Sequence, residues 1–322
     1  MAVSGVISGV RLSRLACAVP PTVVMNECFS SAFGAEQMQK FEKMVGVKER
    51  RMTSEGETTA TLAVRAAKKI ADIKDVDAVL FVSQTPNRVL PATACIIHQE
   101  LNLKSDCIAY DINLGCSGFV YGVFSAAGLF KMDGIRRILL CGGDTISKLT
   151  DKNDSASAPL FGDAGFALML ERDEAATEIR YAFKTDGTGS RAISCDFGGH
   201  LAMDGMDVFN FTINEVPDLI KAEMSAAKLI AEDVDYLVLH QANRFVLKQV
   251  AMMTGFPMKK VPISMDRFGN TSSASIPLTL CDLADRDQGV KKVVMSGFGV
   301  GLSWGTLIMD FDLSVCQPII GA

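Results

Sequence analysis

Short apolar runs alternate along this chain with longer segments of helical periodicity. The apolar runs are rich in Val, Ile and Leu, begin after a charged residue, and lie within residues 75–84, 107–112, 136–143, 233–241 and 291–298. Such runs are typical of strands buried on both faces of a sheet covered by helices. Helical patterns cover residues 58–73, 118–132, 216–229, 244–254 and 275–286. The alternation of the two patterns predicts an α/β fold.

The second half of the chain repeats the pattern of the first. Residues 75–84 (DVDAVLFVSQ) share their plan with residues 233–241 (DVDYLVLHQ), and residues 136–143 share theirs with residues 291–298. The two pairs are separated by nearly the same number of residues, which indicates a duplicated unit. We therefore predict two similar α/β halves, residues 1–172 and 173–322, packed as one body. In such folds the site is expected at the C-terminal ends of strands, where the halves meet.

Composition excludes several classes of function. The 322 residues are 48% hydrophobic and 21% charged, as in a globular protein, and the net charge of −5 provides no basic surface for nucleic acid. No apolar run approaches the roughly 18 residues that span a bilayer, and no signal sequence is recognisable, which predicts a cytosolic protein without a membrane partner. The nine cysteines form no C-x-x-C pair. We interpret them as reduced thiols, mostly in the core, and expect neither a metal site nor disulfides.

Cys116 has the sequence surroundings of a nucleophile. Residues 107–112 are predicted to form a strand, residues 113–115 a tight turn, and residues 119–131 an apolar helix. This arrangement places Cys116 at a helix N-terminus, where unpaired N–H groups and the helix dipole favour a thiolate. The alternative is ordinary core packing of a small apolar side chain.

Two later residues could complete such a site. His240 ends a β-rich run and is followed by polar residues, and Asn270 follows a glycine in Phe268-Gly269-Asn270-Thr271. A cysteine, a histidine and an asparagine together suggest acyl-thioester chemistry. Read singly, His240 could be a core histidine and Asn270 a turn or helix-cap residue.

The glycine-rich segment 297–301 (GFGVG) does not predict a nicotinamide site. Its spacing lacks the final Gly-x-x-Gly of dinucleotide loops, and no acidic residue follows at the required distance. Close approach of the backbone, with N–H groups directed at an oxyanion, is the simpler interpretation.

Taken together and in this order, the motifs resemble those of β-ketoacyl-acyl-carrier-protein synthase III, a condensing enzyme of the thiolase superfamily. The matching segments run through nearly the whole chain: 46–51 (GVKERR), 113–119 (NLGCSGF), 161–165 (FGDAG), 240–243 (HQAN), 269–277 (GNTSSASIP) and 297–305 (GFGVGLSWG). The resemblance implies a five-layered αβαβα thiolase-like fold, a homodimer, and no cofactor beyond the thioester substrates.

The resemblance also implies roles for single residues. Cys116 would accept an acyl group from acyl-CoA or acyl carrier protein, with the oxyanion held by the backbone N–H groups of Cys116 and Val300. Malonyl-acyl carrier protein would then lose CO₂, while His240 and Asn270 stabilise the enolate. The product would be a 3-oxoacyl thioester. Residues expected to contact substrate are Leu90, Asn243, Arg244 and Phe298.

Some positions depart from the family pattern. The tryptophan and arginine that hold the CoA adenine in the family correspond to Lys40 and Met44, and the order after HQAN is Arg244-Phe245, the reverse of the usual order. These departures suggest a specialised relative that either loads from a carrier protein or serves a secondary pathway. In the family a bulkier residue at the position of Leu90 reaches across the dimer and forms the bottom of the partner's acyl pocket. A leucine there should leave a deeper pocket, which predicts that the enzyme accepts acyl chains longer than acetyl.

Two alternative functions remain open at this point. The chain could pass the acyl group from Cys116 to an amine or hydroxyl without condensation, or it could be a non-catalytic subunit of a heterodimer. The presence of Asn270 argues against simple transfer, and the complete set of three residues argues against an inactive subunit. A degradative thiolase would carry a second cysteine in the last glycine loop, which this chain lacks.

Overall fold

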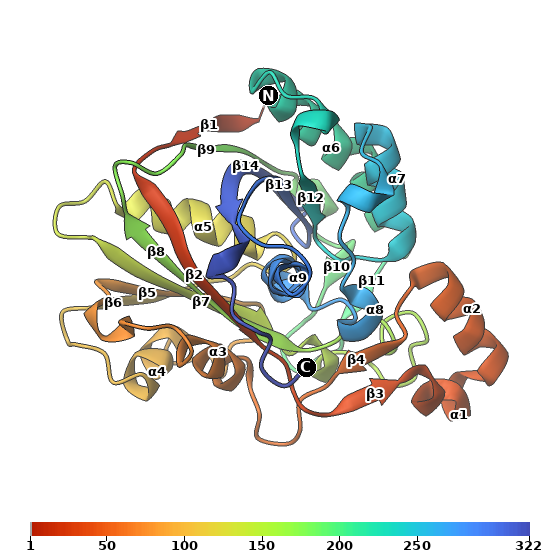
Figure 1. Ribbon diagram of the computed structural model, residues 1–322. Helices are drawn as coiled ribbons and strands as arrows, with labels where there is room; N and C mark the ends of the chain where they lie inside the picture. The colour runs from red at the N-terminus through yellow and green to blue at the C-terminus, as the bar shows by residue number, and fades with distance from the viewer. Residues whose placement is uncertain (1) are drawn as a thin grey trace.

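Two five-stranded sheets form the centre of the protein, in a computed structural model that describes residues 2–322 (Figure 1). The first sheet has the order β2 (Val10–Ala18), β8 (Ala164–Arg172), β7 (Arg137–Asp144), β5 (Ala78–Val82), β6 (Ile108–Ile112). The second has the order β1 (Val3–Ile7), β9 (Ile179–Thr185), β14 (Ser303–Asp312), β13 (Val290–Gly299), β12 (Tyr236–Leu239).

Helices form three layers around and between the two sheets. The central layer consists of α5 (Gly118–Leu129) and α9 (Ser275–Ala284), and the outer layers of α3 (Thr59–Ala67) with α4 (Thr93–Glu100) and of α6 (Gly205–Ala226) with α7 (Arg244–Thr254). Every residue of β5 is buried because helices cover both faces of its sheet. The order of layers is αβαβα, as predicted.

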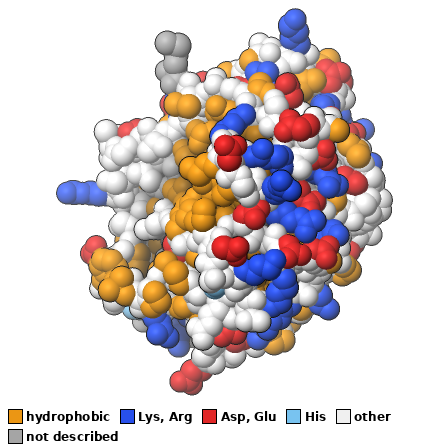
Figure 2. Space-filling view, turned by 90° about the vertical axis from the view of Figure 1, so that its left-hand side faces the viewer, with side chains coloured by type: hydrophobic (Ala, Val, Ile, Leu, Met, Phe, Trp, Pro, Cys, Tyr) orange, Lys and Arg blue, Asp and Glu red, His pale blue; other side chains and the backbone are white. Residues whose placement is uncertain are grey.

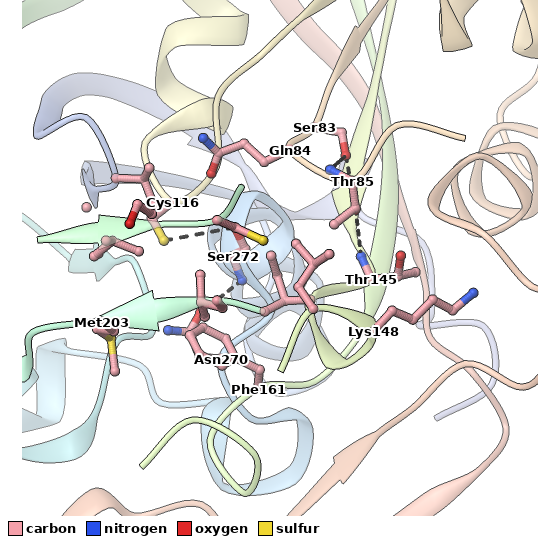
Figure 3. A pocket seen from close by; sticks show the side chains of 18 of the residues that line it. Ser83, Gln84, Thr85, Cys116, Thr145, Lys148, Phe161, Met203, Asn270 and Ser272 are labelled. Carbon is pink, nitrogen blue, oxygen red and sulfur yellow. Dashed lines mark hydrogen bonds between the residues drawn. The ribbon is translucent and has the colours of Figure 1, made fainter. Parts of the chain in front are cut away.

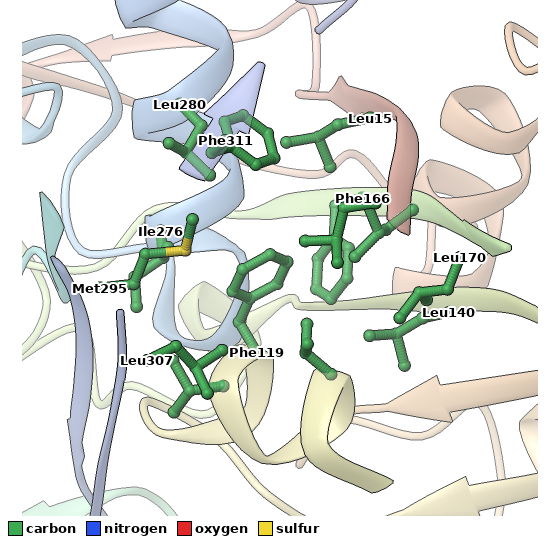
Figure 4. Close-up of a cluster of buried hydrophobic side chains, with 14 of the residues drawn as sticks. Leu15, Phe119, Leu140, Phe166, Leu170, Ile276, Leu280, Met295, Leu307 and Phe311 are labelled. Atoms are coloured by element: carbon green, nitrogen blue, oxygen red, sulfur yellow. The ribbon is translucent and has the colours of Figure 1, made fainter. Parts of the chain in front are cut away.

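The central layer joins the two sheets through one continuous apolar core (Figure 4). Phe119 of α5 packs edge-to-face on Phe166 of β8, with 5.4 Å between ring centroids. Ile276 of α9 lies close to Met295 of β13 in the same cluster. Because α5 and α9 touch both sheets, the halves share a core, and elements from both can meet at one site.

The repeated sequence segments occupy equivalent places in the two sheets. Strand β5 pairs in parallel with β7, and β12 pairs in parallel with β13. Next to these pairs, β7 runs antiparallel to β8 and β13 antiparallel to β14. The duplication inferred from the sequence is therefore visible in the strand pairing.

The two ends of the chain each lie on the sheet of the opposite half. Strand β1 pairs with β9 in the second sheet, although the next strand, β2, belongs to the first. At the other end, Cys316 and Ile320 form parallel bridges with Leu15 and Ala18 of β2 in the first sheet. The predicted boundary at 172/173 falls at the end of β8.

Smaller elements complete the chain. They are β3 (Val23–Met25), β4 (Glu49–Arg51), β10 (Ile193–Ser194), β11 (Ala202–Met203), α1 (Ser30–Phe33), α2 (Ala35–Val45) and α8 (Met265–Phe268). None of the helices within residues 2–322 is long and apolar enough to cross a membrane.

Two details of the sequence prediction are wrong. Helix α6 begins at Gly205 and not near residue 216, because Asp204 caps it by accepting hydrogen bonds from the backbone N–H groups of Met206 and Asp207. Pro217 lies inside this helix. Cysteines are also less confined to the core than expected, since Cys95 is exposed on α4.

Candidate active site

A cavity of about 830 Å³ opens where the two halves meet (Figure 3). It contains the side chains that the sequence analysis singled out, although they come from distant segments. Its walls include Cys116, Asn243, His240, Asn270, Phe298 and Val300. The structure therefore brings the three candidate catalytic residues and both oxyanion candidates to one place.

Cys116 lies in the turn between β6 and α5, two residues before the helix begins at Gly118. The end of β13 packs directly against it: a Cβ atom at Gly299 would lie 2.8 Å from the Cβ of Cys116. This close approach explains the glycine at position 299. It also brings Val300 to the nucleophile, as the sequence analysis predicted.

Burial opposes the thiolate that the sequence analysis expected for Cys116. Burial raises the pKa of Cys116 to about 12, and the negative charge of Asp144 adds to this rise. Hydrogen bonds from the backbone N–H groups of Val300 and Cys116 act in the opposite direction without cancelling the cost of burial. Burial thus favours the thiol form of Cys116, while two backbone N–H groups are directed at its sulfur.

His240 follows β12, and hydrogen bonds of both its backbone and its side chain hold it in place. Its backbone N–H donates to the carbonyl of Ser296 at 2.8 Å, and its Nδ1 lies 2.7 Å from Ser275 Oγ at the start of α9. The ring packs edge-to-face against Phe298, with 5.4 Å between centroids. Burial lowers the pKa of His240 to about 3, so the imidazole is neutral at physiological pH.

Asn270 lies in the loop between α8 and α9, with its orientation fixed by hydrogen bonds. Its backbone N–H donates to the carbonyl of Leu160 at 2.9 Å, and its Oδ1 accepts from the backbone N–H of Ser272 at 2.9 Å. Because Oδ1 is engaged in this turn, the amide Nδ2 is the end left for a ligand in the cavity. The turn role and the site role considered for Asn270 are thus compatible.

Sequence reasoning gave no role to Ser272 or Asp144, which are polar residues of the site. Ser272 Oγ lies 3.9 Å from Cys116 Sγ, and the backbone of Ser272 has a positive φ of 51°. Asp144 ends β7 and is completely buried, accepting hydrogen bonds from Ser83, Thr85 and Ser273 side chains. Asp144 could have been found from its place at the carboxyl end of a buried strand, but the unusual φ of Ser272 has no signature in the sequence.

The four residues expected to contact substrate are placed differently. Asn243 and Phe298 line the cavity, and Asn243 also caps α7 by accepting from the N–H of Val246 at 2.8 Å. Leu90 and Arg244 are exposed and are not among the lining residues of this chain. Arg244 instead packs beside Gly46. A substrate role for each of the four stays a prediction.

Two of the positions where the sequence departs from the family pattern lie on α2. Lys40 forms an exposed ion pair with Glu36 at 2.8 Å, and Met44 is exposed. Within residues 2–322 no group of three or more His, Cys, Asp or Glu side chains is arranged to hold a metal ion.

Comparison with known proteins shows the family of this chain. Residues 110–187 match the family described as 3-oxoacyl-[acyl-carrier-protein] synthase III, and residues 224–311 match its C-terminal part. The β-ketoacyl-[acyl-carrier-protein] synthase III of Rhizobium meliloti is 34% identical over 91% of this chain and 96% of its own length. The chain belongs to the synthase III family.

Other members of the family confirm this assignment. The synthase III of Streptococcus gordonii is 32% identical over 93% of this chain and 98% of its own length. The crystal structure of a 3-oxoacyl-(acyl-carrier protein) synthase from Burkholderia xenovorans superposes with a TM-score of 0.94 over 99% of both chains, at 34% identity. The predicted thiolase-like fold and the acyltransferase class of a condensing enzyme are confirmed.

Proposed function

We propose that this synthase III member acylates Cys116 from an acyl thioester and then condenses the acyl group with malonyl-acyl carrier protein. One observation supports this most directly. A thiol, a neutral imidazole and a side-chain amide with a free Nδ2 share one cavity, contributed by Cys116, His240 and Asn270. Neutral donors stabilise an enolate without protonating it, which is what a carbon–carbon bond-forming step needs.

In the first step the sulfur of Cys116 attacks the carbonyl carbon of the donor thioester. The backbone N–H groups of Cys116 and Val300, which already face the sulfur, would hold the oxyanion that forms beside it. The carrier thiol leaves, and the proton of the Cys116 thiol goes to this leaving group. Because burial keeps Cys116 protonated, proton loss accompanies the attack and does not precede it.

In the second step malonyl-acyl carrier protein loses CO₂ and becomes an enolate. Hydrogen bonds from His240 and from Asn270 Nδ2 would stabilise the enolate oxygen. The enolate carbon attacks the carbonyl of the acyl-Cys116, and the sulfur leaves as the product, a 3-oxoacyl thioester, forms. A simple transfer to an amine or hydroxyl would leave the amide of Asn270 without a role.

Acyl-CoA and acyl carrier protein are both proposed as donors. The surface at α2 carries Lys40 and Met44, and neither offers the stacking or the bidentate contact that an adenine nucleotide favours. This supports loading from a carrier protein. The absence of a further cofactor and the cytosolic location stay predictions.

We also propose a homodimer formed along β6. Within the described residues β6 pairs on one side only, with β5, and Ile108 at its start is 43% exposed. Figure 2, a view from the left-hand side of Figure 1, shows that hydrophobic side chains gather on this face of the molecule, the side on which β6 lies. An apolar edge strand is a template for pairing with a second copy. Ile108→Glu should therefore give a monomer by sedimentation velocity.

Mass spectrometry of the intact protein tests the proposed chemistry. The wild-type chain mixed with acyl-CoA or acyl-carrier protein should gain the mass of one acyl group, and addition of malonyl-acyl carrier protein should discharge it as a 3-oxoacyl thioester. Cys116→Ser should gain no adduct and keep its fold. An adduct mapped to any other cysteine, or a stable adduct that malonyl-acyl carrier protein never discharges, would contradict the proposal.

A further inference from the structure

The cavity around Cys116 has two chemically different sides. The loop after β5, residues 83–89, lines one side and presents the side-chain amides of Gln84 and Asn87. The other side carries Asn270 together with apolar side chains, among them Phe161 and Met203. In Figure 3, Gln84 lies on one side of the Cys116–Ser272 pair, whereas Asn270, Phe161 and Met203 lie on the other.

The amide of Gln84 is fitted closely beside the nucleophile. A Cβ atom at Gly115 would lie 2.2 Å from Gln84 Oε1 and 3.1 Å from Ser272 Oγ, so both groups lie against the backbone of Gly115. Two hydrogen-bonding side chains thus converge on the residue that precedes Cys116. The Gln84 amide makes no hydrogen bond to another side chain or to the backbone within residues 2–322, whereas its backbone N–H is anchored by Asp144 at 2.8 Å.

A second amide on the same side lacks a partner within the described chain. Asn87 Oδ1 is buried without a hydrogen bond, although the backbone N–H of Asn87 donates to Thr93 Oγ1 at 3.2 Å. Burying a polar atom without a partner is costly, and such groups are retained where a ligand can satisfy them. The neighbouring hydroxyls of Ser83 and Thr85 are already engaged with Asp144. Among the uncharged polar side chains of residues 83–89, Gln84 and Asn87 are therefore the two still available to a ligand.

The direction in which each substrate must enter determines which part of it lies beside the amides of Gln84 and Asn87. In the proposed function, the carrier-bound malonyl group must reach His240 and Asn270, so the carrier arm enters along the side of Asn270, Phe161 and Met203. The acyl chain attached to Cys116 must then extend away from that entrance, toward Gln84. An unsubstituted alkyl chain placed there would leave both amides without hydrogen bonds.

We propose that the acyl group transferred to Cys116 carries a hydroxyl, and that Gln84 recognises it. A hydroxyl can donate to Gln84 Oε1 and accept from its Nε2, so one substituent satisfies an amide that alkyl groups cannot. The inference rests on the proposed function, because it concerns the acyl group of the same acyl-enzyme. In this proposal Gln84 determines which acyl group is accepted and takes no part in the reaction itself.

Acylation rates for donors of equal length test the inference. Butyryl-CoA and both enantiomers of 3-hydroxybutyryl-CoA, followed by the same acyl groups on acyl carrier protein, are compared by intact mass for the wild type and for Gln84→Met. One hydroxybutyryl enantiomer should acylate the wild type roughly tenfold faster than butyryl does, as expected for one buried hydrogen bond. Gln84→Met, which keeps the length of the side chain, should abolish that preference while butyryl still loads.

The matched control is Gln99→Met, the same substitution on the exposed side of α4, which should retain the wild-type preference. Equal or faster loading of butyryl by the wild type would overturn the inference and leave the proposed function intact. An unchanged preference in Gln84→Met would also overturn it. If no donor acylates Cys116 on either carrier, the proposed function fails, and this inference fails with it.

Discussion

Ser273 donates two hydrogen bonds to the buried carboxylate of Asp144, from its backbone N–H at 3.1 Å and from its hydroxyl at 2.7 Å. The other oxygen of Asp144 accepts from Ser83 Oγ at 3.0 Å and from the N–H of Gln84 at 2.8 Å. One carboxylate therefore ties the loop beside Cys116 to the loop that carries Asn270. The first loop belongs to one half of the chain and the second to the other.

Replacing this carboxylate should weaken both loops at once. Asp144→Asn keeps the size of the side chain but turns one acceptor into a donor that faces the donors of Ser273 or Ser83. We expect a loss of about 2–3 kcal/mol in the free energy of unfolding, measured in urea. Acylation and condensation should fall together. Asp285→Asn, on the exposed end of α9, is the control and should change neither.

Asn270 should matter for condensation more than for acylation. Asn270→Ala should still form the acyl-enzyme but lose condensation by a factor on the order of 10²–10³, as for removal of one buried donor. Asn270→Asp separates donation from loop support, because it keeps an acceptor for the N–H of Ser272 and lacks the Nδ2 donor. Single-turnover assays of the two half-reactions measure this. Equal losses in both half-reactions would assign Asn270 a purely structural role.

The reactivity of Cys116 should report its raised pKa. Because burial raises this pKa to about 12, the thiolate fraction of the unliganded protein is small at pH 7. The rate of alkylation of Cys116 by iodoacetamide should rise about tenfold per pH unit from pH 7 to pH 10, with no plateau. Peptide mapping must follow Cys116 itself, since Cys28, Cys95 and Cys195 are exposed. A plateau near pH 7 would instead indicate a stable thiolate.

His240 should make the fold sensitive to acid. Folding lowers the pKa of His240 from 6.5 to about 3, so between these pH values the unfolded chain binds a proton that the folded chain does not. The free energy of unfolding should therefore fall as the pH drops below 6.5, by about 1.4 kcal/mol per pH unit from this group. His240→Gln should flatten this dependence. The exposed His200→Gln serves as the control and should keep the wild-type slope.

Leu90 provides a separate prediction about chain length. It is 80% exposed in the single chain, as a residue that floors the partner's acyl pocket would be. A leucine there should leave a deeper pocket than a larger residue, so donors longer than acetyl should load, with roughly 0.8 kcal/mol for each methylene that finds an apolar wall. Leu90→Phe should shift the preference toward short chains across a C2 to C10 series. Strict acetyl preference in the wild type would contradict the pocket argument.

The sequence predicted the parts of the site that depend on order along the chain. Cys116 in a strand–turn–helix unit and His240 after a buried strand were both recognisable, because such positions follow from local patterns. The ionisation of Cys116 was not, since it depends on how completely the opposite half buries the sulfur. Asp144 and Gln84 were missed for a similar reason: their hydrogen bonds and contacts join segments more than twenty residues apart.

The pairing of each chain end with the sheet of the opposite half affects how the protein unfolds. A fragment that ends at residue 172 would carry β1 without its partner β9, and the remaining fragment would carry Cys316 and Ile320 without β2. Each fragment would expose a sheet edge that the other fragment covers in the intact protein. The two halves, although built on one repeated plan, are therefore expected to melt in a single transition and to regain structure only when both are present.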